Sequence, residues 1–133
     1  MAIIIKSEHE IQLMRQAGRI NAGVLEELAR AVRPGISTRA LDRMARDLLR
    51  SAGATPAFLG YPNPNPFFAD ARYPAAINAS INDELVHGIP GRRRLREGDI
   101  LSIDCGTVYQ GYIGDSAITV PVGRISAEAR RLL

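Results

Sequence analysis

The sequence predicts an α+β fold in which amphipathic helices come first and antiparallel strands follow. Apolar residues recur at helical spacing through the first fifty residues, and short apolar runs of strand character follow residue 75. The 133 residues are 46% hydrophobic and 23% charged, which is enough apolar content for one core. We therefore expect a single domain over residues 1–133.

The first helix is predicted over residues 8–31. Ser7 and Glu10 form a capping box, and the apolar residues that follow lie on one helical face. These are Ile11, Met14, Ala17, Val24, Leu25 and Leu28. A second helix is expected between a cap at Ser37 or Thr38 and a stop at Gly53, and Ser126 opens a short third one.

Strand character is found later in the chain, and a proline-rich loop precedes most of it. Residues 62–66 alternate proline with asparagine, which neither a helix nor a central strand tolerates, so we expect an exposed loop there. The apolar segments are residues 55–61, 75–81, 85–89, 100–107 and 112–122.

Two aspartates in the last two strands are the strongest candidates for chemistry. If Thr107 pairs with Tyr112 across a four-residue loop, Asp104 lies directly opposite Asp115. Facing carboxylates repel each other unless a cation or a proton lies between them, and hard oxygen donors suit divalent metals. The spacing alone also fits ordinary turn and strand-end aspartates.

The cysteine and the two histidines differ in what they predict. Cys105 should point to the sheet face opposite Asp104, as a buried core residue and not a ligand. His9 falls in the first helical turn and is most simply a surface residue. His87 lies where a strand gives way to a loop, so it either faces a cleft or is an ordinary exposed histidine.

Charge and cysteine content bear on location and partners. One cysteine, no export signal and no apolar run of about 20 residues predict a cytoplasmic chain that does not span a membrane. The net charge is +3, and arginines 92, 93, 94 and 96 crowd one loop. A solvated turn explains this cluster, with a weak anionic or nucleic-acid contact as the alternative.

Two stretches of the sequence resemble the type I methionine aminopeptidases. They read YPAAINASINDELVHGIP over residues 73–90 and EGDILSIDCGTVYQGYIGDSAITVPV over residues 97–122. The opening segment IKSEHEIQLMRQAGRI is also similar to that family's first helix. The resemblance implies the N-terminal half of a pita-bread fold, so the domain is expected to be incomplete.

The resemblance also implies an activity and a set of site residues. Asp104 and Asp115 would bind two divalent metal ions, of cobalt, manganese, iron or zinc, and His87 would contact the substrate beside the scissile carbonyl. Tyr61 and Tyr73 match aromatic positions of the methionine pocket. The implied reaction removes the initiator methionine from nascent polypeptides, which are therefore the expected partners, with the ribosome as a further candidate.

Several positions depart from the family pattern. Tyr61 and Tyr73 are separated by the proline-rich loop, Asn78 stands where many relatives have cysteine, and Ile113 stands where histidine often occurs. The family also needs a histidine and two glutamates that would follow Leu133 in its members. We therefore expect this chain to be a fragment that is inactive alone and that associates with itself through exposed surface.

Two other interpretations remain open at this stage. One is a non-catalytic pita-bread binding module that contacts the ribosome or nucleic acid through the arginine loop. The other is a metallopeptidase of the prolidase type, although the order of NDELVHGIP and SIDCG is more similar to the methionine enzymes.

Overall fold

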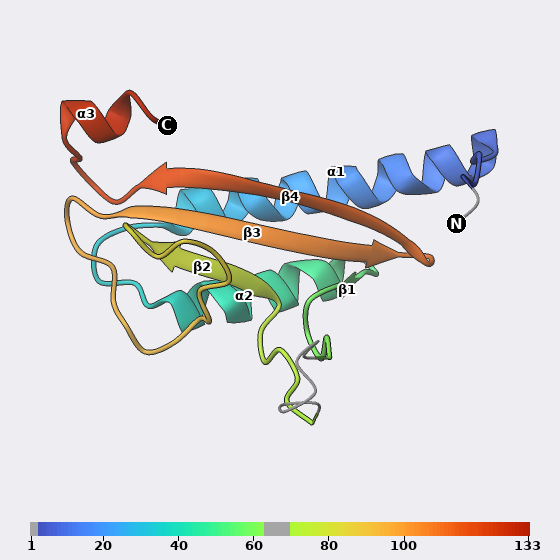
Figure 1. Ribbon diagram of the computed structural model, residues 1–133, viewed down its shortest axis with the longest axis horizontal. Coiled ribbons are helices and arrows are strands. Elements are labelled where there is room, and N and C mark those ends of the chain that lie inside the picture. Colours follow the sequence, from blue (N-terminus) through green and yellow to red (C-terminus); the bar gives the residue numbers. More distant parts are fainter. Residues whose placement is uncertain (1–2, 63–69) are drawn as a thin grey trace.

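A computed structural model describes residues 3–62 and 70–133, and it has two layers (Figure 1). Two long helices cover one face of a four-stranded antiparallel sheet. The elements are α1 (Glu8–Ala31), α2 (Thr38–Ser51), β1 (Thr55–Pro56), β2 (Ile77–Ile81), β3 (Ile100–Tyr109), β4 (Tyr112–Pro121) and α3 (Ala127–Arg130). Strand β3 is central, because β4 pairs with one edge and both β1 and β2 pair with the other.

The predicted first helix is confirmed with its bounds and its cap. The Ser7 hydroxyl accepts from the Glu10 backbone N–H, and the Glu10 carboxylate accepts from the Ser7 backbone N–H at 2.7 Å. The apolar face of α1 is only partly buried, since Ile11 and Met14 are 44% and 40% exposed. Its later turns, from Ala17 to Leu28, carry the buried contacts with the sheet.

The second helix also follows the prediction. Ser37 caps α2, and Gly53, with φ +69°, lies in the left-handed conformation that lets the chain leave the helix. Leu41 and Leu49 are fully buried and belong to the same core cluster as Ile103 of β3. Burial of such side chains contributes roughly 1.5–3 kcal/mol each, so the helix layer and β3 hold each other in place.

The strand prediction was partly wrong in two segments. Residues 55–61 form only the two-residue strand β1, because the chain bends at residues 57–58 and then turns at Gly60, where φ is +79°. Residues 85–89 form no strand, and Leu85 is 91% exposed. The backbone of this segment is not extended throughout, because His87 has a φ of +58°, so its apolar residues do not continue as a strand. Of the proline-rich loop, residues 63–66 lie outside the described residues.

The predicted hairpin register was wrong by two residues. Tyr109 pairs with Tyr112, so the loop is the two-residue turn Gln110–Gly111, with φ +48° and +84°. Positive φ at both positions is the type I′ geometry, which matches the twist of paired strands. In this register Asp104 pairs with Ala117, and Asp115 pairs with Gly106.

A buried polar contact fastens α1 to this hairpin. Asn21 is 1% exposed, its amide nitrogen donates to Ser116 Oγ at 2.7 Å, and its amide oxygen accepts from Thr107 Oγ1 at 2.7 Å. Beside it, Gly114 lies so close to α1 that a Cβ there would meet the Ala17 carbonyl carbon at 2.7 Å. Helix and hairpin are therefore in direct backbone contact.

Among the helices of residues 3–62 and 70–133, none combines the length and the apolar character that crossing a bilayer requires.

Glu10 should make the stability of the fold sensitive to acid. Hydrogen bonds from the Ser7 backbone, the Ser7 hydroxyl and the Tyr112 hydroxyl lower the pKa of Glu10 from 4.5 to about 2. A carboxylate whose pKa falls on folding adds stability that is fully present above pH 4.5 and is lost as the pH falls towards 2. We expect Glu10→Gln to lower the melting temperature at pH 7 and to flatten its decline below pH 4.5.

The matched control is Glu8→Gln, which removes a charge from the same helical turn and leaves those hydrogen bonds intact. Thermal melts followed by circular dichroism between pH 2 and pH 7 measure both variants. The prediction would be contradicted if the melting temperature of Glu10→Gln fell below pH 4.5 as steeply as that of the unmodified protein.

Candidate active site

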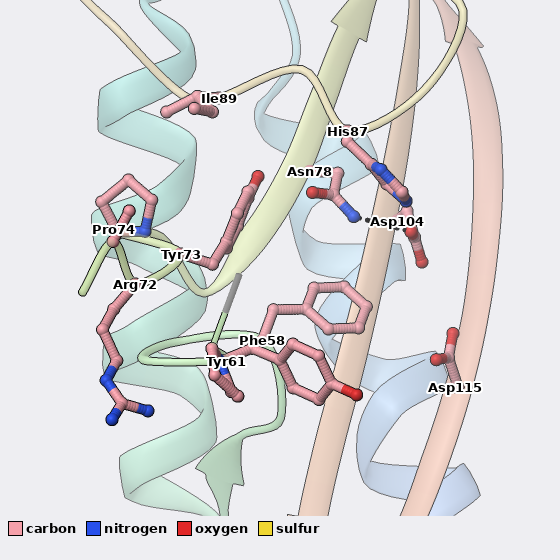
Figure 2. A pocket seen from close by; sticks show the side chains of 12 residues that line it. Phe58, Tyr61, Arg72, Tyr73, Pro74, Asn78, His87, Ile89, Asp104 and Asp115 are labelled. Carbon is pink, nitrogen blue, oxygen red and sulfur yellow. Dashed lines mark hydrogen bonds between the residues drawn. The ribbon is translucent and has the colours of Figure 1, made fainter. Parts of the chain in front are cut away.

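One pocket of about 680 Å³ opens on the sheet face that the helices leave uncovered (Figure 2). It brings together the six residues that the sequence and the family resemblance predict for the site. They are Tyr61, Tyr73, Asn78, His87, Asp104 and Asp115. Other lining residues include Phe58, Arg72 and Ile89.

The two aspartates lie on the same sheet face as diagonal neighbours. Asp115 pairs with Gly106, so it is offset from Asp104 by two residues of β3. The sequence had predicted that the two aspartates lie directly opposite each other, and this prediction was wrong. Asp104 is half-buried and Asp115 is exposed. Partial burial, and then the negative charge of Asp104, raise the pKa of Asp115. The two carboxylates therefore repel each other, and a cation between them would relieve this repulsion.

This donor set fits part of a divalent metal site. Two carboxylates on one sheet face supply hard oxygen ligands of the kind that such metals take in mixed-ligand sites. Within residues 3–62 and 70–133, no group of three or more histidine, cysteine, aspartate or glutamate side chains is placed to hold a metal. In the part of the chain that the structure describes, the two carboxylates therefore have no third side chain of these types beside them.

Aromatic side chains form the apolar wall of the pocket. Although the proline-rich loop separates them in sequence, Tyr61 and Tyr73 are joined by a backbone hydrogen bond of 2.9 Å from the Tyr73 N–H to the Tyr61 carbonyl. The Tyr73 hydroxyl donates to the Ile77 carbonyl at 3.2 Å, and burial raises the pKa of Tyr73 to about 12. Tyr73 is therefore a fixed neutral wall, whereas Tyr61 is 65% exposed.

An ion pair on α2 holds the segment that carries Tyr73 into the pocket. Asp42 accepts from the Ala76 N–H at 2.6 Å and from Arg46 Nε at 2.9 Å. The same arginine donates to the Pro74 carbonyl at 2.7 Å. Since Asp42 is 6% exposed, these bonds satisfy a buried charge and tie the backbone after Tyr73 to the helix layer.

His87 reaches the pocket from a loop that lies along the free edge of β2. Its backbone φ of +58° is in the left-handed region, which is costly for a residue with a side chain. The next residue fixes it there, because the Gly88 carbonyl accepts from the Ala79 N–H at 2.8 Å and the Gly88 N–H donates to Ser80 Oγ at 3.1 Å. In Figure 2 the imidazole points towards Asp104.

Comparison with known proteins decides the family. The model of metallopeptidase family M24 matches residues 12–133. The chain belongs to this family.

Its relatives are named methionine aminopeptidases. The protein of that name from Aquifex aeolicus is 52% identical over 134 residues, covering 100% of this chain and 51% of the relative. Methionine aminopeptidase 1 of Bacillus subtilis is 47% identical over 131 residues, covering 98% and 49%. The crystal structure of the enzyme from Rickettsia prowazekii superimposes with a TM-score of 0.89 at 31% identity, covering 98% and 49%.

These matches confirm the predicted resemblance and fold. The M24 chain forms the N-terminal half of a pita-bread fold, with helices on an antiparallel sheet, and it spans about half the length of the relatives it matches. Membership in a metallopeptidase family implies divalent metal as the cofactor of the group.

Sequence reasoning missed Phe58, which packs over the sheet between the tyrosines and Asp104 in Figure 2. The signal was Gly106, a glycine inside a strand. A Cβ there would lie 2.7 Å from the Phe58 ring and 2.9 Å from the Ala57 Cβ. Glycine within a strand often marks such a close approach, so the aromatic residue fits this M24 chain only because position 106 has no side chain.

The remaining candidates lie away from the pocket or at its margin. Cys105 is fully buried on the helix side of the sheet, where burial raises the pKa of its thiol to about 12, as expected for a core residue. His9 is exposed on α1. Ile113 is 57% exposed on the same face of β4 as Asp115 and does not line the pocket.

The position of His87 should depend on the missing side chain of Gly88. A Cβ at Gly88 would lie 2.5 Å from the Ala79 carbonyl oxygen, a backbone atom that cannot move without disturbing β2. We expect Gly88→Ala to destabilise the fold by about 1–3 kcal/mol and to detach the loop that carries His87. Urea unfolding and the NMR shifts of the His87 ring measure the two effects.

The matched control is Gly91→Ala in the same loop, where the nearest atom to an added Cβ lies at 3.9 Å. This variant should unfold like the unmodified protein. Equal stability and equal His87 shifts for Gly88→Ala would show that the loop does not depend on this contact.

Proposed function

We propose that this chain is the first half of the catalytic domain of a methionine aminopeptidase, over residues 1–133, and that the whole enzyme removes initiator methionine from nascent polypeptides. The observation that carries the proposal is the shared pocket of Asp104, Asp115 and an aromatic wall. Carboxylates suit metal-assisted hydrolysis, and an apolar aromatic wall suits a thioether side chain. The prolidase alternative has less support, because relatives at 40–52% identity are named methionine aminopeptidases.

Each site residue has a proposed task. Asp104 and Asp115 would hold divalent metal, which when bound lowers the pKa of water and polarises a carbonyl. Phe58, Tyr61 and Tyr73 would enclose the methionine side chain and keep water from it. His87, at the mouth of the pocket, would donate a hydrogen bond to the oxygen of the scissile carbonyl as its charge develops.

We further propose two metal ions in the complete site, drawn from cobalt, manganese, iron and zinc. Two oxygen ligands on one sheet face support a metal pair, since a shared carboxylate can bridge ions about 3.5–4 Å apart. Among the described residues, no group of three or more histidine, cysteine, aspartate or glutamate side chains is placed to hold a metal. The isolated chain should therefore bind metal weakly and release no methionine at a measurable rate.

Metal binding by the chain tests this proposal directly. We expect Mn²⁺ to bind at pH 7 with a dissociation constant in the millimolar range, and we expect Asp104→Asn to weaken binding at least tenfold, because one of two charged ligands is lost. The electron paramagnetic resonance signal of free Mn²⁺ measures the dissociation constant of each variant. Asp99→Asn is the control, since this aspartate bonds to Asn82 in another pocket.

A companion assay follows release of methionine from a Met-Ala peptide with added manganese or cobalt. Turnover that disappears in Asp104→Asn would refute the predicted inactivity. Equal Mn²⁺ binding by Asp104→Asn and the unmodified chain would refute the metal site.

We propose that the protein works in the cytoplasm, where nascent chains emerge, with the ribosome as a candidate partner. Arg93, Arg94 and Arg96 line a second pocket of about 480 Å³, which favours anions and supports the alternative of a nucleic-acid binding module. Much of this charge is already engaged, because Arg93 pairs with Glu84 and Arg94 donates to a backbone carbonyl. The enzyme proposal therefore has the stronger support.

We also propose that the isolated chain associates with itself. In the part of the chain that the structure describes, β4 pairs with β3 alone, and the neighbouring side chain of Ile113 is 57% exposed. An open strand edge beside an apolar side chain invites pairing with another copy. Light scattering after size exclusion should show a mass that rises with concentration, and Ile113→Lys should reduce the rise.

Leu85→Lys is the matched control for self-association. This residue is also an exposed apolar side chain, 91% exposed, but it lies in the loop beyond β2. A mass equal to one chain at every concentration would refute the proposal.

A further inference from the structure

Asn78 is a buried polar residue in the middle of β2, directly beside the candidate metal site. It is 5% exposed and pairs across the sheet with Asp104 of β3. A buried amide costs free energy unless its polar atoms are hydrogen-bonded. The partner that Asn78 has is therefore informative.

The Asn78 amide nitrogen donates to Asp104 Oδ2 at 2.8 Å. A bond between an amide and an ionised carboxylate is charge-assisted, so it is stronger than a bond between neutral groups. A carboxylate offers about four lone-pair sites, and this bond uses one of them. Asp104 is thus held in one orientation while most of its acceptor capacity stays free for a ligand in the pocket.

We propose that Asn78 is a positioning residue for metal binding, which orients the Asp104 carboxylate before metal arrives. The inference rests on the proposed metal site and adds a residue that touches no metal. Hydrogen bonds to a ligating carboxylate commonly change metal affinity by 10–100-fold, because they remove the cost of ordering the ligand. In Figure 2 the amide oxygen of Asn78 points away from Asp104 and towards Tyr73, so only the nitrogen acts on the carboxylate.

A neighbour on the same strand separates this role from a merely structural one. Ser80 lies two residues further along β2, on the same face, and is also 5% exposed. Its hydroxyl accepts from the Gly88 N–H and not from a carboxylate. Loss of either side chain disturbs a buried hydrogen bond in β2, but only Asn78 contacts Asp104.

The test measures Mn²⁺ affinity in Asn78→Leu, Asn78→Ala and Ser80→Ala, with thermal melts of each metal-free protein. Leucine has nearly the shape of asparagine and no donor, and alanine gives a second variant if the larger side chain disturbs the strand. We expect both Asn78 variants to bind Mn²⁺ about tenfold more weakly. Ser80→Ala should keep its affinity within twofold, even where its melting temperature falls.

A double variant shows whether the effect passes through Asp104. In an Asp104→Asn background, Asn78→Leu should cause no further loss of Mn²⁺ binding, because the oriented carboxylate is already gone. Unchanged affinity in both folded Asn78 variants, with binding still abolished by Asp104→Asn, would overturn the inference and leave the metal site standing. Absence of Asp104-dependent binding in the unmodified chain would overturn both.

Discussion

The two-residue turn at Gln110–Gly111 sets the register on which the candidate site depends. Side chains alternate along a strand, so a shift of one residue in the pairing of β3 and β4 would place Asp115 on the helix side of the sheet. Positive φ at both turn residues restricts the loop to two residues. The turn therefore decides that both carboxylates face the open side and that they are diagonal neighbours.

The two faces of the sheet have different tasks, and β3 contributes to both. On one face, Ile103 and Cys105 are fully buried under the helices. On the other face, Asp104 lines the pocket, and it lies between those two residues in the sequence. The contact of Asn21 with Thr107 and Ser116 keeps α1 on the hairpin from the buried side. The rigid layer behind the sheet thus holds the carboxylates without occupying the face where a ligand would enter.

Local signals made the helices predictable, whereas the hairpin needed information that composition does not carry. The capping box at Ser7 and the stop at Gly53 each act within one turn of the chain, so sequence alone locates α1 and α2. The turn was missed because Gln–Gly is a weaker signal of type I′ geometry than Asn–Gly. Strand pairing and residue type singled out Asp104, Asp115 and His87, and family resemblance added the two tyrosines and Asn78. Phe58 was missed because its signal lies 48 residues away, at Gly106.

Gly106 links the apolar wall of the pocket to its charge. It lies between Asp104 and the turn on β3 and pairs with Asp115, so the ring of Phe58 occupies the space that its side chain would fill. The ring covers the sheet at Gly106, so it keeps water from one side of the carboxylate pair, while Asp115 itself stays exposed. Charges interact more strongly where water is excluded, so the repulsion between Asp104 and Asp115 is less screened on the side of the ring. The glycine that admits the aromatic wall therefore also affects how strongly the two carboxylates interact.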